Sequence, residues 1–193
     1  MKVITTGQWE EELWYQAEAI YNAAFPEDGR KSRGIIRNMF AQNLCYLHVG
    51  YLQGQAIAMA ITGKTEDSRA LIIDYFAVDE KRRGTGIGGT FLEEIKKWAI
   101  ALRRIQFLLI EVESDESEEN DRRSRFWGRH GFRSTAYVHQ YIWVPEPYRA
   151  MYLPLIPGQF AFDGQELFAS ITRFHQKSFK WRKEAFGPDP TNG

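Results

Sequence analysis

The chain has 193 residues, of which 44% are hydrophobic and 26% are charged, and its 25 Lys and Arg balance its 25 Asp and Glu. A chain of this length suits one domain, or one domain with an appendage, and can bury enough surface to fold without metal or disulfide staples. Nucleic-acid-binding proteins normally carry a clear basic excess, so a net charge of zero argues against that class. Cys45 is the single cysteine, which excludes a disulfide within the chain, and no paired metal ligands stand out.

The first half of the chain predicts antiparallel strands accompanied by two helices. An apolar stripe from Leu13 to Ala24 indicates a helix that stops at Pro26, and residues 32–41 predict a second one. Short strands are expected over residues 2–5, 44–52, 57–64 and 70–78, with turn residues between the last three. The N-terminus lacks an apolar signal-peptide core, and no run approaches the ~18 apolar residues of a membrane-spanning helix. We therefore expect a cytoplasmic protein that does not enter a membrane.

The middle of the chain predicts a pair of parallel strands. Residues 70–78, ALIIDYFAV, form a nearly continuous apolar run of the kind that is buried on both faces of a sheet. A Gly-rich loop, a helix with apolar residues from Phe91 to Leu102, and an apolar strand over 105–112 follow. Two strands joined by a crossover helix are parallel neighbours. A polar, acidic loop then leads to a helix over 121–130, ended by Gly131, and to a final strand or pair of strands over 135–144.

The composition changes after Pro145, where the chain becomes rich in proline and aromatic residues. Asp163 resembles an N-cap, with Glu166 completing a capping box, and the helix that they begin is expected to run to about residue 185. Its apolar face would contain Leu167, Ile171, Phe174, Ser178 and Trp181. We interpret residues 1–145 as one domain and residues 146–193 as a C-terminal extension with one amphipathic helix.

The most informative segment is VDEKRRGTGIGG, residues 78–89, between the buried strand and the following helix. Its glycines let the backbone approach a ligand closely, and the N–H groups and positive dipole end of the helix point at the same place. Arg82 and Arg83 add charge that can reach phosphate oxygens. The segment predicts a site for an anion such as a pyrophosphate, whereas the alternative is a flexible turn with solvated arginines.

Two nucleotide-binding motifs compete for this loop. Gly84-x-Gly86-x-x-Gly89, with Glu111 further along, fits the dinucleotide fingerprint. That motif begins almost directly after its strand, however, whereas residues 79–83 intervene here, and its fold continues with strand–helix alternation that the downstream sequence lacks. A P-loop is excluded because no Lys-Ser or Lys-Thr ends the loop.

The better match is the GNAT acetyltransferase superfamily, whose motif Arg/Gln-x-x-Gly-x-Gly/Ala is met by residues 83–88, RGTGIG. The chain also resembles members of that family in the order of Asn120, Trp127 and the Gly131-Phe132 pair, and in its strand and helix order from residue 2 to about 144. The resemblance implies an α+β fold, with a mixed, mostly antiparallel central sheet and flanking helices, which is the acyl-CoA N-acyltransferase fold. The extension beyond Pro145 lies outside it.

By this resemblance the co-substrate is acetyl-CoA, with no metal. The backbone of the strand ending at Val78 would pair with the pantetheine arm, the amides of the loop would hold the pyrophosphate, and Asn120 with its helix would meet the arm and the adenine. The implied coenzyme-binding residues are Phe76, Ala77, Val78, Arg83, Gly84, Thr85, Gly86, Ile87, Gly88, Gly89, Asn120 and Trp127. The two parallel strands would separate to admit the thioester, and the Val78 amide would face the oxyanion of the tetrahedral intermediate.

Transfer of an acetyl group needs a neutral amine, so a general base is expected. Glu111 occupies a position where some family members carry a catalytic glutamate, and Asp74 within IIDYFAV is the second candidate. Trp127 stands where many members have a tyrosine that acts as the general acid, and an indole does not usefully ionise. Tyr141, Tyr137 or His130 would then supply the proton, or the thiolate leaves unassisted.

The resemblance implies an N-acetyltransferase whose acceptor is an amine of a small molecule or peptide. Carboxylates after the second parallel strand and in the first helix–helix loop favour a cationic acceptor, although a solvated acidic loop explains them equally. The aromatic extension could cover the acceptor site, form the face of a homodimer, or pack as additional core. The alternatives to an acetyltransferase are a catalytically idle acyl-CoA-binding or interaction protein and a dinucleotide-dependent oxidoreductase.

Overall fold

The computed structural model describes residues 1–142, 144–158 and 162–180, which contain five α-helices and seven β-strands. They form two compact units whose chain segments alternate. The first unit comprises residues 1–63, 74–95 and the chain from His175 onward, and the second comprises residues 64–73 and 96–174. The α+β class and the mostly antiparallel strand pairing are as predicted. Within the described segments, no helix has both the length and the apolar character needed to cross a membrane.

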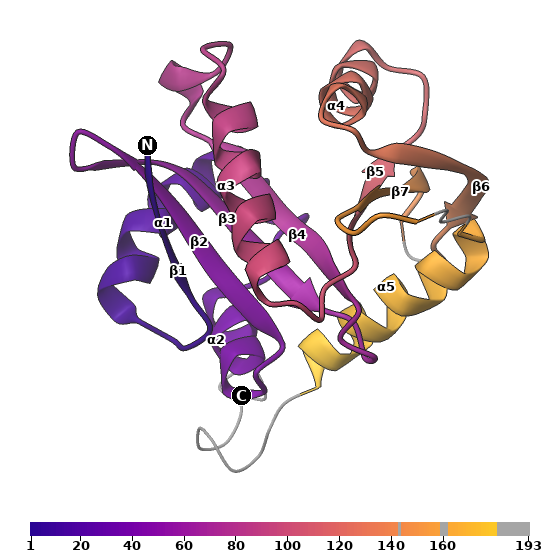
Figure 1. Ribbon diagram of the computed structural model, residues 1–193, viewed down its shortest axis with the longest axis horizontal. Coiled ribbons are helices and arrows are strands. Elements are labelled where there is room, and N and C mark those ends of the chain that lie inside the picture. The colour runs from indigo at the N-terminus through magenta and orange to yellow at the C-terminus, as the bar shows by residue number, and fades with distance from the viewer. Residues whose placement is uncertain (143, 159–161, 181–193) are drawn as a thin grey trace. The chain divides into compact units, whose positions relative to one another are not determined.

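The first unit is built on an antiparallel meander of β1 (Lys2–Thr6), β2 (Cys45–Leu52) and β3 (Gln55–Lys64). Figure 1 shows α1 (Glu11–Ala24) and α2 (Arg33–Ala41) beside the meander and α3 (Ile87–Ala101) crossing it. Helix α2 begins where the Ser32 hydroxyl accepts a hydrogen bond from the Ile35 amide, as an N-cap should. These elements agree with the strands and helices predicted from the apolar patterns.

A small hydrophobic cluster fixes α3 to the meander. Phe91 and Ile95 of α3 pack on Ala58 and Ala60 of β3, and all four side chains are fully buried. Alanines on the strand allow the close approach of the helix that this packing requires. Partly buried residues at the end of strand β4 (Ala70–Val78) and at the start of α3 join the same cluster: Phe76, Val78 and Ile87. The cluster therefore anchors both ends of the Gly-rich loop.

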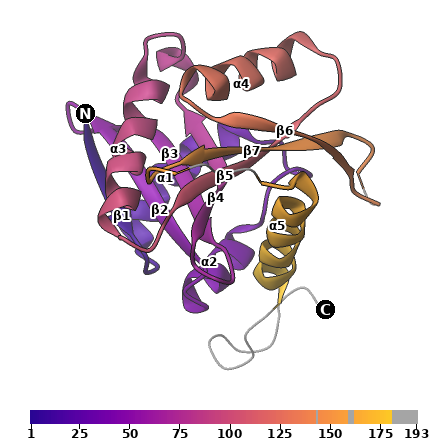
Figure 2. The same cartoon turned by 45° about the vertical axis from the view of Figure 1, so that its right-hand side comes forward.

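The second unit contains the first residues of β4, followed in the sheet by β5 (Phe107–Glu113), β7 (Pro147–Pro154) and β6 (Arg133–Gln140). Strands β4 and β5 are parallel from Ala70↔Phe107 to Ile72↔Leu109, which confirms the pair predicted from the crossover helix. From Ile110 to Glu113, β5 continues its antiparallel ladder with β7. Figure 2 shows β6 and β7 side by side in this unit.

Strand β7 and the bounds of two neighbouring elements differ from the sequence expectations. Residues 147–154 were interpreted as part of an extension, yet they form a strand paired with both β5 and β6. A strand or pair of strands was predicted over residues 135–144, and β6 ends earlier, at Gln140. Helix α4 is Glu118–Arg129 and begins before residue 121, because Ser117 acts as its N-cap and accepts from the Asn120 amide.

Helix α5 (Gly164–Phe179) starts as predicted, with the Asp163 carboxylate accepting from the Gln165 amide at 2.9 Å. A side chain at Gly164 is sterically excluded, since a Cβ there would lie 2.5 Å from Cβ of Tyr137. The predicted apolar face is buried at Leu167, Ile171, Phe174 and Ser178, and Phe168, which was not predicted to belong to it, is buried as well. Trp181 and the expected helix end near residue 185 lie outside the described residues. The division of the chain at residue 145 stays a prediction.

Candidate functional site

The Gly-rich loop of the first unit combines a short 3₁₀ turn, Glu80–Arg82, with two left-handed glycines. Gly84 and Gly86 have φ angles of +77° and +83°, a region that residues with a Cβ avoid. A Cβ built on either glycine would meet no other atom within 4 Å, so their surroundings are open. The loop is kept in shape by the Thr85 hydroxyl, which donates to the Arg82 carbonyl at 2.6 Å.

Helix α3 begins directly after these glycines, with Ile87, Gly88 and Gly89 in its first turn. The N–H groups of a first helical turn have no acceptor within the helix and carry the positive end of its dipole. The exposed loop therefore presents N–H groups toward open space, which is the arrangement that binds a phosphate or pyrophosphate.

Two features of the strand before the loop favour binding of a ligand through its backbone rather than through its side chains. The side chains of Phe76 and Val78 are directed into the cluster with Phe91, and Ala77 is 6% exposed, so these residues have little side chain to offer a ligand. The Arg83 guanidinium donates through Nε to the Val78 carbonyl at 3.2 Å, which holds this cation beside the loop.

Asp74, the second candidate base, is engaged in a buried ion pair of the first unit. Lys31 Nζ lies 2.8 Å from Asp74 Oδ1 and 2.9 Å from Oδ2, with side-chain exposures of 5% and 4%. His175 Nδ1 lies 3.3 Å from the same Nζ, and the Lys31 amide donates to the Tyr75 hydroxyl. The carboxylate thus joins the chain before α2 to β4, a role that requires no proton transfer.

Glu111, the first candidate base, is hydrogen-bonded to Tyr141 in the second unit. The Tyr141 hydroxyl, just after β6, donates to Glu111 Oε2 at 2.7 Å. Burial, followed by the nearby Glu111 carboxylate, raises the pKa of Tyr141 well above its usual value. Two of the three predicted catalytic residues therefore lie in direct contact, and the phenol keeps its proton at neutral pH.

Aromatic side chains surround this hydrogen bond. The Tyr141 ring packs edge-to-face on His139 at 4.5 Å and on Tyr148 at 5.5 Å, and His139 stacks on Phe168 of α5 at 4.4 Å. Burial raises the pKa of Tyr148 to about 12, with further contributions from Glu113, Glu111 and Glu146. Neither Tyr148 nor Phe168 was predicted for the site, because both follow Pro145. Alternation of Tyr148, Ala150 and Tyr152 was the available signal for a strand there.

Asn120 and Trp127, the α4 residues predicted to bind the coenzyme, make local contacts. Asn120 is 5% exposed and donates through Nδ2 to Asp115 Oδ1 at 2.6 Å, while its Oδ1 accepts from Arg123. Trp127 is 6% exposed and packs edge-to-face with Phe132 at 5.0 Å. Both stabilise the start and the packing of α4. Their contact with a coenzyme stays a prediction.

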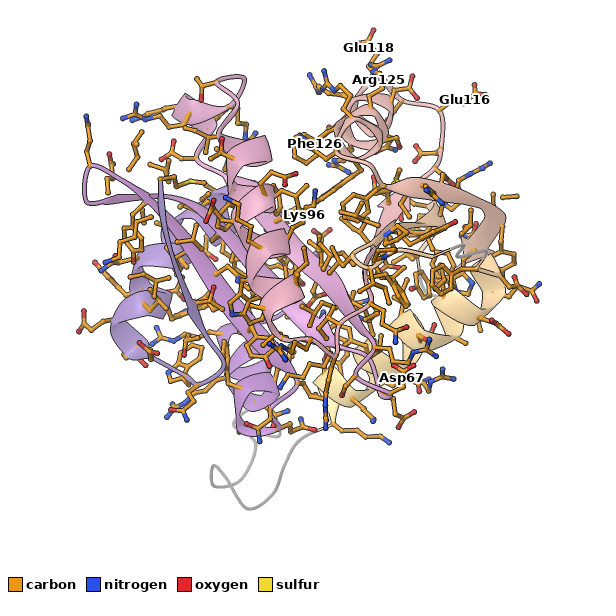
Figure 3. All side chains as sticks on the ribbon, viewed as in Figure 1. Asp67, Lys96, Glu116, Glu118, Arg125 and Phe126 are labelled. Atoms are coloured by element: carbon orange, nitrogen blue, oxygen red, sulfur yellow. The ribbon has the colours of Figure 1, made fainter. Side chains whose placement is uncertain are left out.

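Some carboxylates around the start of α4 form ion pairs, and others are exposed to solvent. Glu113 and Glu119 pair with Arg123 at 3.2 Å and 2.6 Å. Figure 3 shows Glu116 and Glu118 projecting outward from the loop and the first turn of α4, and both are exposed. The segment thus contains solvated acids as well as the Glu113 carboxylate near Tyr148. Across the described parts of the chain, no group of three or more His, Cys, Asp or Glu is arranged to hold a metal ion.

The model of the acetyltransferase (GNAT) family matches residues 10–132, which is more than half of the chain. A search of the curated proteins found no match.

Solved structures with the same fold share little sequence with this chain. A protein from Bacteroides thetaiotaomicron assigned to the GNAT family superposes with a TM-score of 0.68 at 16% identity, covering 98% of this chain and 100% of that one. An aminoglycoside 6′-N-acetyltransferase complexed with coenzyme A gives 0.66 at 13%, covering 83% and 100%. The ribosomal-protein-S18-alanine N-acetyltransferase from Escherichia coli gives 0.59 at 20%, covering 84% and 100%.

Proposed function

Because this chain belongs to the acetyltransferase (GNAT) family, we propose that it transfers the acetyl group of acetyl-CoA directly to a primary amine within a ternary complex. The observation that carries the proposal is the loop of residues 84–86, with two left-handed glycines in open surroundings at the start of α3. A pyrophosphate needs close approach to backbone N–H groups, and this loop offers that approach without a side chain in the way. Arg83 beside it adds a positive charge.

Glu111 is the proposed general base. An alkylamine with a pKa of ~10.4 is protonated at pH 7, and removal of its proton costs about 4–5 kcal/mol. A carboxylate within reach of the amine, or of a water that leads to it, accepts this proton as the amine attacks. Glu111 is half-buried and is oriented by the Tyr141 hydroxyl, whereas Asp74 is already bound by Lys31. These contacts favour Glu111 over Asp74.

The proposed reaction balances when both protons that the ammonium group loses are followed. The first is taken by Glu111, or by a water that leads to it, and passes on to solvent, which leaves the neutral amine. The amine nitrogen then forms a bond to the thioester carbonyl carbon, its second proton passes to Glu111, and collapse of the tetrahedral intermediate breaks the carbon–sulfur bond. The Val78 amide is proposed to stabilise the oxyanion. Coenzyme A leaves as a thiolate and needs no acid from Trp127, whose indole is buried against Phe132.

The proposed acceptor is a cationic amine. The carboxylates of Glu111, Glu113 and Glu146 lie near Tyr148 and raise its pKa, and Arg123, which pairs with Glu113, offsets part of this negative charge. A second amine or a guanidinium on the acceptor would be attracted to this region, and the Tyr148 and Tyr141 rings offer faces for cation–π contact.

The test is a panel of amines (polyamines, amino sugars and basic peptides) incubated with acetyl-CoA, with release of free thiol as the readout. Turnover that depends on the amine supports the proposal. Stabilisation of the protein by acetyl-CoA without turnover on any amine would instead identify an idle acyl-CoA-binding protein. Stabilisation by NAD but not by acetyl-CoA would indicate an oxidoreductase.

Glu111→Gln tests the base, because it keeps the shape and hydrogen bonding of the side chain but cannot accept a proton. We expect kcat/KM at pH 7 to fall by roughly 10²–10⁴-fold, and the loss to shrink at high pH, where free amine is abundant. Trp127→Phe should leave kcat nearly unchanged and alter affinity or stability. Near-normal kcat/KM for Glu111→Gln at pH 7 would move the base to Asp74 or a water chain.

A further inference from the structure

The hydrogen bond between Tyr141 and Glu111 spans the sheet of the second unit. Glu111 lies in β5 and Tyr141 follows β6, and β7 runs between these two strands. Glu111 stands opposite Ala150 of β7. Paired residues of adjacent strands point to the same face, so a residue as small as alanine leaves room for the phenol to reach across β7. This face also carries His139 and Tyr148, which are paired with each other.

Helix α5 packs on the same face. Phe168 stacks on His139, with ring centroids 4.4 Å apart, and its centroid lies 6.3 Å from that of the Tyr141 ring. Phe168 is 1% exposed, so the side chains on which it packs have little room to move. The packing therefore runs from Phe168 on the helix to Tyr141, and the Tyr141 hydroxyl donates to Glu111.

Resting on the proposed function, we propose that Tyr141 is a positioning residue for Glu111 and that Phe168 of α5 holds Tyr141 in place. The hydroxyl directs one carboxylate oxygen of Glu111, and the aromatic packing prevents the phenol from turning away. Its proton is directed at Glu111, which makes Tyr141 a poor source of a proton for the departing thiolate. Helix α5, which the family model does not reach, thereby supports the catalytic carboxylate.

Other titratable groups lie near Tyr141 and Tyr148, which neighbour this carboxylate. They are Glu113 on β5, Tyr148 on β7, Glu146 just before β7, His139 on β6, and Arg123 on α4. Tyr141→Phe leaves all of these in place and removes a single hydroxyl. A change in the titration of Glu111 can therefore be attributed to the lost hydrogen bond.

The first experiment measures kcat/KM against pH for Tyr141→Phe and Phe168→Leu. A hydrogen bond to the charged form of a carboxylate lowers its pKa, so removing it should move the acidic limb of the profile to higher pH. For Tyr141→Phe we expect a loss of about tenfold at pH 7, mainly in kcat, since a base held less firmly reaches the amine less often. Phe168→Leu keeps an apolar side chain but removes the ring that packs on His139 and Tyr141, and it should shift the limb in the same direction by less.

Two variants serve as matched controls. Ser170→Ala removes a hydroxyl from the same helix that donates to the Glu166 carbonyl and accepts from Arg173, and Tyr51→Phe removes a phenol hydroxyl that donates to Gln16. Both should keep the wild-type rate and pH profile. An unshifted acidic limb in Tyr141→Phe and Phe168→Leu would overturn the proposal, as would an equal shift in both controls.

A second readout does not depend on catalysis. The side-chain carboxyl of Glu111, labelled with ¹³C and assigned by comparison with Glu111→Gln, can be titrated by NMR in the free protein. We expect its midpoint to rise in Tyr141→Phe, and in Phe168→Leu if the former does not fold. An unchanged midpoint would overturn the positioning role even in an active enzyme. Wild-type protein that transfers no acetyl group would refute the proposed function, while a shifted midpoint would still establish the contact.

Discussion

At the scale of single residues, Gly86 determines whether the loop can receive a pyrophosphate. Its φ of +83° disfavours any residue with a Cβ, and valine, being β-branched, is among the least tolerated. We predict that Gly86→Val weakens acetyl-CoA binding at least about tenfold by calorimetry, because the loop loses the conformation that presents its N–H groups. Gly54→Val is the control: Gly54 has a φ of +80° and equally open surroundings, but lies in the β2–β3 turn. Unchanged affinity in a folded Gly86→Val protein, or an equal loss in both variants, would refute the loop assignment.

At the scale of elements, hydrogen bonds between side chains join β1, β2 and β3. They link Thr5, His48 and Thr62. His48 is 0% exposed, and its two ring nitrogens each lie 2.9 Å from a threonine hydroxyl. Burial lowers the pKa of His48 from 6.5 to about 3, so the folded protein binds a proton here less readily than the unfolded chain. The stability that this neutral histidine contributes is present above pH 6.5 and is lost as the pH falls from 6.5 towards 3.

We therefore predict that part of the pH dependence of unfolding disappears in His48→Gln. Between pH 7 and pH 5.5, the free energy of unfolding of the wild type should fall by about 1 kcal/mol more than that of His48→Gln. Urea titrations at the two pH values measure this difference. Thr62→Val should be destabilised but keep the wild-type pH dependence, because His48 stays buried. Equal slopes for the wild type and His48→Gln would show that His48 is not held neutral.

At the scale of the whole molecule, β7 makes the segment after residue 145 essential to the sheet of the second unit. It pairs with β5 from Phe107 to Glu113 on one side and with β6 on the other. A chain that ends at residue 145 leaves two strands without their shared partner and exposes their edges. We predict that this truncated protein is insoluble or lacks a cooperative thermal transition by circular dichroism. A soluble fragment with the melting temperature and mass of the full chain would contradict this prediction.

Much of the fold could be predicted because its signals are local. The apolar run of residues 70–78 is observed as a strand with those same bounds, and the Gly-rich loop lies between strand and helix as expected. Strand β7 was missed because prolines at 145, 147 and 154 bracket it, although its ends tolerate them.

The candidate site was only partly predictable, because its contacts depend on the order of strands. Glu111 and Tyr141 were selected separately, but their hydrogen bond joins residues 30 positions apart through β7. Phe168 has no local pattern that distinguishes it from the other apolar residues of α5. The Lys31–Asp74 pair likewise depends on a loop meeting a strand 43 positions away.

The alternation of chain segments between the two units has a consequence for biosynthesis. The first unit requires residues from His175 onward, since His175 contacts Lys31 and the Asn38 side chain donates to the Lys180 carbonyl. The second unit requires Phe168 and Ile171 of α5. Neither unit can be completed while α5 is still inside the ribosome, so the nascent chain emerges with the rings of His139 and Tyr141 not yet covered by Phe168. This aromatic part of the candidate site is therefore one that chaperones would be expected to shield during translation.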